Sequence, residues 1–163
     1  MTTMCVSAAN YIIELTNVYN EGKSYSTQIS MTCKRLQKLL YFSDIKYMKD
    51  NNGNSMFKDS FYAWPSGPVI PSVYDKFIQY QDGKMEPLDG NHSPLTTQMK
   101  EAIDFVFKNT IDIDTLDLVQ ISHVQDGPWH CAYDPNDEKH EQVIQKSSMF
   151  TFYQAKENFL SLV

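Results

Sequence analysis

The sequence predicts a mainly α protein: a single compact domain of about six helices, with at most a small β element around residues 57–64. Apolar residues recur at the helical spacing of three and four positions in most segments. The chain has 163 residues, of which 42% are hydrophobic, and this is enough to form a core without disulfides or metals. No repeat or linker-like stretch divides it, so we expect residues 1–163 to form one domain.

The N-terminal part of the sequence shows the clearest helical periodicity. A first helix is expected from about Ser7 to Tyr19, with Gly22 as its C-terminal cap. A second helix is expected to follow Ser30 or Thr32, since either side chain can cap its N-terminus. Its apolar side carries Leu36, Leu39, Leu40, Ser43 and Tyr47. Its opposite side carries Arg35, Lys38, Lys46 and Lys49. We expect this basic face to be solvated, although it can also receive an acidic partner surface.

The middle of the chain is predicted to contain a strand and a short helix. The aromatic stretch 59–64 indicates a strand. Pro65 and Pro68 favour extended backbone in the residues that precede them. A helix is expected to begin near Pro71, because proline is well tolerated at the first helical position, and to end in the turn 81–84.

The C-terminal half is predicted to contain three further helices. The dipeptide 93–94 indicates the N-terminus of the first of them, and Asp112 or Asp114 that of the second. Residues 125–129 are expected to form a loop. The last helix is expected to be capped by one of the serines at 147 and 148 and to continue to Leu160.

The charge and the cysteines restrict the location and the partners of the protein. The formal net charge is −6, which argues against duplex DNA as a partner and is compatible with a basic protein. The three cysteines include no Cys-x-x-Cys pair, so a disulfide framework is not expected and a reducing compartment is. The sequence shows no signal-like segment, and its apolar stretches are too short to span a bilayer. We therefore expect a cytoplasmic protein that does not associate with membranes.

The sequence offers few candidates for catalysis. Cys33 and Cys131 are possible nucleophiles, and His123 and His130 are possible bases. Cys33 falls on the apolar side of its helix, where a thiol behaves as a small hydrophobic group. The histidines lack zinc-ligand spacing, and no phosphate-binding loop or nucleophile elbow occurs. We expect no catalytic residue, no metal and no cofactor. A small enzyme that uses Cys131 or His123 is the alternative from another class of function.

Two local patterns place a large aromatic residue beside backbone that proline fixes. One runs over residues 61–74 and includes the tryptophan at 64, and the other is His123 followed by the dipeptide 128–129. We expect both tryptophan rings to fill the core. For the side chains of Tyr62, Ser66 and Tyr74, a core position and a place on a partner-binding surface are equally expected.

These patterns, with the helix segment 36–42 before them, resemble the Panacea antitoxin domain family, which includes SocA-like and GepA-like proteins. The resemblance covers nearly the whole chain, and the ordered set Ala-Trp-x-x-Gly-Pro-Val-x-Pro is its most specific part. The spacing between His123 and Pro128 is slightly longer than the family pattern, and Asp126 fills an acidic position there.

The resemblance implies a helical domain that neutralises a toxin by direct binding. The expected function is that of the antitoxin of a type II toxin–antitoxin system, and its partner is a protein toxin encoded nearby. The alternatives are an adaptor that delivers a toxin to a Clp-type protease and a phage-borne inhibitor of a host protein. No direct DNA binding is expected.

The expected site divides into residues that contact the partner and residues that maintain the motif. The expected partner-binding residues are Tyr62, Ser66, Gly67, Tyr74, His123, Asp126, Trp129, Arg35 and Lys38. The expected structural motif consists of Leu36, Leu39, Leu40, Tyr41, Trp64, Pro68, Val69, Pro71 and Pro128.

Overall fold

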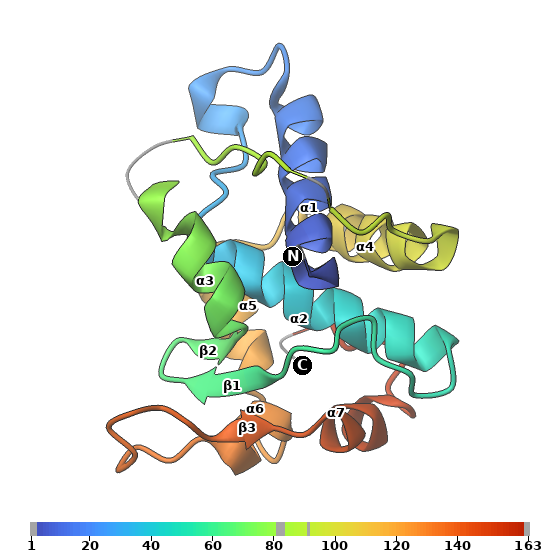
Figure 1. The fold of residues 1–163 in the computed structure, drawn as a ribbon, viewed down its shortest axis with the longest axis vertical. Helices are drawn as coiled ribbons and strands as arrows, with labels where there is room; N and C mark the ends of the chain where they lie inside the picture. The colour runs from blue at the N-terminus through green and yellow to red at the C-terminus, as the bar shows by residue number, and fades with distance from the viewer. Residues whose placement is uncertain (1–2, 81–83, 91, 162–163) are drawn as a thin grey trace.

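The computed structural model describes residues 3–80, 84–90 and 92–161, and within them the chain is mainly helical, as predicted. Seven α-helices, two short 3₁₀ turns and a small antiparallel sheet make up this part of the chain (Figure 1). The helices are α1 (Met4–Asn20), α2 (Cys33–Asp50), α3 (Pro71–Phe77), α4 (Thr97–Thr110), α5 (Thr115–Ser122), α6 (Pro128–Ala132) and α7 (Lys146–Tyr153). The 3₁₀ turns are η1 (Tyr25–Thr27) and η2 (Ile78–Tyr80), and the strands are β1 (Phe61–Trp64), β2 (Gly67–Val69) and β3 (Val143–Ile144).

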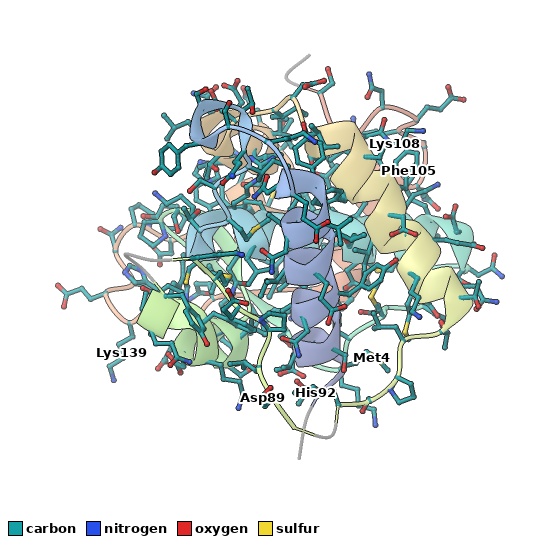
Figure 2. All side chains as sticks on the ribbon, turned by 90° about the horizontal axis from the view of Figure 1, so that it is seen from above. Met4, Asp89, His92, Phe105, Lys108 and Lys139 are labelled. Carbon is teal, nitrogen blue, oxygen red and sulfur yellow. The ribbon has the colours of Figure 1, made fainter. Side chains whose placement is uncertain are left out.

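Helix α2 is the central element of the fold. It contacts α1, α3, α4, α5, α7 and β2. Helices α1 and α4 lie on one side of it, and the sheet with α6 and α7 lies on the other (Figure 1). Seen from above, α1 and α4 lie side by side, with Phe105 on α4 labelled (Figure 2). Thr32 caps α2 as predicted, because its hydroxyl accepts a hydrogen bond from the backbone N–H of Arg35 at 3.1 Å. The predicted leucines Leu36, Leu39 and Leu40 are all buried.

The expectation that the basic residues of α2 are solvated is wrong for two of the four. Arg35 is 5% exposed and Lys38 is 0% exposed. The guanidinium of Arg35 donates to the carbonyls of Thr110 and Ile113, at 2.8 Å each, where α4 ends. The carbonyl of Thr110 also accepts the N–H of Ile113 at 3.0 Å, and the buried cation supplies the further donors that water would otherwise provide at this helix end. The sequence periodicity cannot show this, because the partners of Arg35 are backbone atoms.

The sheet has the strand order β2-β1-β3, and both pairings are antiparallel. The predicted strand is β1, whereas β2 and β3 are too short to be expected from the sequence. Trp64 pairs with Gly67, so residues 65–66 connect β1 to β2 as a two-residue turn. Gly67 has φ +117°, a conformation that residues with a Cβ rarely adopt.

Several helix ends differ from the predictions. Helix α4 is capped by Thr96 and not by the dipeptide 93–94. Asp114 caps α5 as expected, since its carboxylate accepts the N–H of Asp117 at 2.8 Å. Residues 128–132 form α6, so the last two residues of the expected loop 125–129 are helical. Helix α7 begins at Lys146 after Gln145 and ends at Tyr153, well before residue 160. Residues 81–83 of the predicted turn lie outside the described part.

The part of the core between α2, β1 and the segment after α7 is mostly aromatic. Phe159 follows the last helix and is 5% exposed, and its ring lies 6.4 Å from that of Phe42 and 6.0 Å from that of Tyr153. Tyr41 meets Phe61 edge to face at 5.4 Å. This packing joins α2 to β1 and to the end of the chain. None of the described helices has the length and apolar character needed to cross a membrane.

Candidate functional site

The three segments of the motif meet around the amine of Lys38. Its Nζ donates a hydrogen bond to the carbonyl of Pro68 at 3.2 Å, which joins α2 to β2. A Cβ added at Gly67 would lie 2.5 Å from Lys38 Cε and 2.9 Å from the hydroxyl oxygen of Ser122. Two separate features therefore require glycine at position 67: its positive φ and the close approach of Lys38. Ser122 belongs to α5, so α2, the hairpin and α5 share one contact point.

Within the described part of the chain, the buried amine of Lys38 has no anionic partner to offset its burial. Burial, together with the positive charge of Lys34, lowers the pKa of Lys38 to about 7. Among the described residues, the hydrogen-bond partner of the amine is the carbonyl of Pro68. A buried lysine releases its proton more readily than a lysine in water, because desolvation penalises the cation. Near neutral pH, Lys38 therefore takes up and releases a proton inside the protein.

A stack of three rings lies next to Lys38. The imidazole of His123 lies 3.6 Å from the Trp129 ring, with an angle of 6° between the two planes. The Trp129 ring in turn lies 4.6 Å from that of Tyr133, at 14°. Burial, together with the charge of Lys38, lowers the pKa of His123 to about 4. His123 is therefore neutral at physiological pH, as suits a ring stacked on an indole. Its buried Nε2 has no hydrogen-bond partner among the described residues.

The two tryptophans have different environments. Trp129 is 7% exposed and its Nε1 donates to the carbonyl of Trp64 at 2.8 Å, which ties α6 to β1. The expectation that both rings fill the core is correct for Trp129 and wrong for Trp64, which is only half-buried. The Trp64 ring meets that of Tyr74 edge to face at 5.2 Å. Along β1, Phe61 and Ala63 are buried whereas Tyr62 and Trp64 are half-buried, because neighbouring residues of a strand point to opposite faces.

Several partly exposed side chains lie around the buried Trp129 and form a surface that we call the rim. We define the rim as Tyr62, Trp64, Ser66, Tyr74, His123 and Asp126, of which Asp126 is exposed and the others are half-buried. The structure thus brings together most of the predicted contact residues. Gly67, Lys38 and Trp129 lie beneath the rim as buried supports. Arg35 lies apart from them, at the end of α4.

A second buried charge was missed by the sequence analysis. Asp44 of α2 is 0% exposed and accepts hydrogen bonds from Ser55 Oγ and from the N–H of Met56, at 2.7 Å each. Lys146, at the start of α7, forms an ion pair with it at 2.8 Å. The only sequence signal for this pair is an acidic residue on the apolar side of α2. The pair connects α7 to the centre of the fold.

The residue types near Lys38 invite comparison with a hydrolase, since a lysine of lowered pKa can activate a serine. The geometry does not support that chemistry. Ser122 Oγ donates to the carbonyl of Val119 at 2.7 Å, and both Ser122 and Lys38 are 0% exposed. Two hollows, of about 390 and 340 Å³, open on the surface, and neither is lined by these two residues.

The cysteines and histidines are not paired for nucleophilic catalysis either. Cys33 Sγ contacts the carbonyl of Phe77 at 3.3 Å, and Cys131 Sγ contacts that of Asp126 at 3.5 Å. His130 Nδ1 accepts the N–H of Asp126 at 3.1 Å. In residues 3–80, 84–90 and 92–161, no group of three His, Cys, Asp or Glu side chains is placed to hold a metal ion. The site is thus a packed support beneath a half-exposed aromatic surface.

Sequence comparison assigns the chain to a family. The family described as "Antitoxin SocA-like, Panacea domain" matches residues 36–130, which span Lys38, the β1–β2 hairpin, His123 and Trp129. The chain therefore belongs to the SocA-like Panacea domain family. Among curated proteins, it is similar to Antitoxin SocA of Caulobacter vibrioides (strain NA1000 / CB15N), with 31% identity over 118 residues. The alignment covers 66% of this chain and 62% of the relative, so the chain spans less than two thirds of that protein. No solved structure matches the chain significantly.

Proposed function

We propose that this protein is the antitoxin of a type II toxin–antitoxin system and neutralises a protein toxin, encoded nearby, by direct binding. Membership in the SocA-like family supports the antitoxin role. The half-exposed pair formed by Trp64 of the hairpin and Tyr74 of α3 is the observation that carries direct binding. Tryptophan and tyrosine are frequent anchors of protein interfaces because each buries a large area with few rotatable bonds.

The rim is the contact surface in this proposal, and the buried residues beneath it hold it in place. Lys38 fixes Pro68 from below, and Trp129 fixes the carbonyl of Trp64. A surface that is already ordered loses little conformational entropy on binding, so more of its contact energy appears as affinity. Of the predicted contact residues, Lys38, Gly67 and Trp129 therefore act through the rim and do not touch the toxin.

The proposed activity is binding without catalysis, in the cytoplasm and without direct contact with DNA. The site geometry supports the absence of catalysis, because the residues that resemble a nucleophile and base are buried or are bonded to backbone carbonyls. The net charge of −6 supports a protein partner over duplex DNA, which would repel an acidic surface.

Growth of cells that express the product of the neighbouring reading frame tests the proposal. The parent protein should restore growth and should elute with that product in size-exclusion chromatography. Ser66→Arg places a long charged side chain on the rim and should weaken binding about tenfold, with the melting temperature unchanged. Ser147→Arg, which makes the same substitution at an exposed position of α7, is the matched control.

Two results would contradict the proposal at different points. If the parent neither restores growth nor binds the product, the antitoxin function is wrong for this pair. If Ser66→Arg binds and protects as the parent and Ser147→Arg do, the function stands and the rim is not the contact surface. Tyr74→Ala provides an independent variant of the same surface, since it removes one ring of the Trp64–Tyr74 pair.

A further inference from the structure

A groove on a different part of the molecule from the rim has the properties of a second contact surface. We propose that this groove, which lies between the segments 26–30 and 111–115, receives a segment of the toxin that carries a lysine or arginine next to an apolar side chain. The inference rests on the proposed function and adds to it the second surface and the chemistry of its partner.

The groove is a surface hollow of about 390 Å³. Tyr19 and residues 26–30 line one side of it, residues 111–115 line the other, and Arg35 also contributes. Two of the most exposed apolar side chains of the described structure directly adjoin the lining in sequence. Tyr25 is 93% exposed and Leu116 is 68% exposed. Large apolar groups left in water next to a hollow favour contact with a partner.

The walls of the groove are ordered before any partner arrives. The side chain of Asn20 holds one wall, because it donates to the carbonyl of Ile29 at 2.9 Å and accepts the N–H of Ile29 at 2.8 Å. Arg35 holds the other wall through the carbonyls of Thr110 and Ile113. Asp114 caps α5 at the end of the same wall. A groove fixed in this way binds a segment at a low entropic cost.

The charges that the groove presents to solvent are mainly acidic. Asp112 and Asp114 are exposed, and Asp112 forms no hydrogen bond or ion pair with its side chain in the described part of the chain. The cation that lines the groove, Arg35, is 5% exposed and uses both terminal nitrogens on carbonyls. Lys23 nearby is engaged over the ring of Tyr19 at 4.1 Å. A basic side chain of the partner would therefore meet an unpaired carboxylate.

These features together define the occupant. The acidic residues select a basic side chain, and the exposed rings and aliphatic groups at Tyr25 and Leu116 select an apolar neighbour. A hollow of about 390 Å³ holds a few side chains and not a whole domain. The occupant is therefore a short segment of a toxin whose main contact is elsewhere.

Surface plasmon resonance against the immobilised product of the neighbouring reading frame tests the groove. The variants are Asp112→Lys, Leu116→Ser and their combination, and Glu101→Lys is the matched control. Glu101 is exposed on α4 and does not line the groove. The double variant should bind about tenfold more weakly, with an unchanged melting temperature. Asp112→Lys should also slow association at low salt, and the difference should disappear as salt is added.

The outcomes separate this inference from the proposed function. If the parent binds and the groove variants bind with the same affinity and association rate, the groove inference is overturned and the antitoxin function stands. If the parent does not bind the product at all, both are overturned. If Glu101→Lys weakens binding as much as Asp112→Lys does, the effect is one of overall charge, and the groove is not a specific site.

Discussion

Replacing the buried lysine at the centre of the site should stabilise the protein. Lys38 has a pKa of about 7 against 10.5 for an ordinary lysine, so keeping it neutral or burying it charged costs roughly 4 kcal/mol at pH 7. Methionine has a similar length and no charge. Lys38→Met removes that cost but leaves the carbonyl of Pro68 without its donor, a loss of roughly 1–3 kcal/mol. The variant should therefore be more stable than the parent by about 2 kcal/mol at pH 7.

The pH dependence of this difference gives the stronger test. Because the folded pKa of Lys38 is lowered, the unfolded chain binds more protons between pH 7 and 10.5, and the stability of the parent rises with pH in that window. The advantage of Lys38→Met should fall by roughly 1 kcal/mol per pH unit and should be close to zero near pH 9. Urea unfolding of both proteins at several pH values from 7 to 9 measures it. A stability difference that does not change with pH would refute the reasoning, because it would show that the amine titrates as it does in water.

Three further predictions concern the residues around this centre and the second buried charge. Gly67→Ala should cost roughly 2–5 kcal/mol of unfolding free energy, because φ is +117° and the new Cβ would lie 2.5 Å from a side chain, whereas Gly22→Ala, in open space, should cost about 1. Lys146→Met should cost about 3 kcal/mol, since it leaves the carboxylate of Asp44 buried without its cation; a loss well under 1 would contradict the pairing. NMR titration of the His123 imidazole should have its midpoint near 4, and stability should decrease as the pH falls from 6.5 toward that value; a midpoint near 6.5 would place the ring in water.

The helices of this fold were predictable where apolar periodicity and capping residues occur together. The leucines of α2 and the caps Thr32 and Asp114 follow from short-range rules, and the structure confirms them. The predicted start of α4 was displaced because Thr96 is also a good cap and lies closer to the apolar periodicity. Strands β2 and β3 were not predictable, since strands of three and two residues are defined by their partners.

Most of the residues of the candidate site could be predicted from the sequence, but which of them are buried could not. The motif residues Trp64, Gly67, His123 and Trp129 do meet in space. The sequence could not show that Lys38 is inside, because periodicity assigns a lysine to the solvent when its partner is a distant backbone carbonyl. The sequence also could not show that the two tryptophans differ in burial. Trp129 lies in a short helix, and Trp64 lies on a strand whose alternate residues are half-buried.

The strand order has a consequence for synthesis of the protein. β1 is the middle strand, but its second neighbour, β3, is supplied by residues 143–144, after all of α3 to α6 has been made. Until then the nascent chain carries a strand with one open edge, and such edges pair readily with other chains. A ribosome that stalls before residue 143 would therefore release a product prone to aggregation. Strand β3, near the C-terminal end of the sequence, thus protects the edge of β1, which is synthesised first.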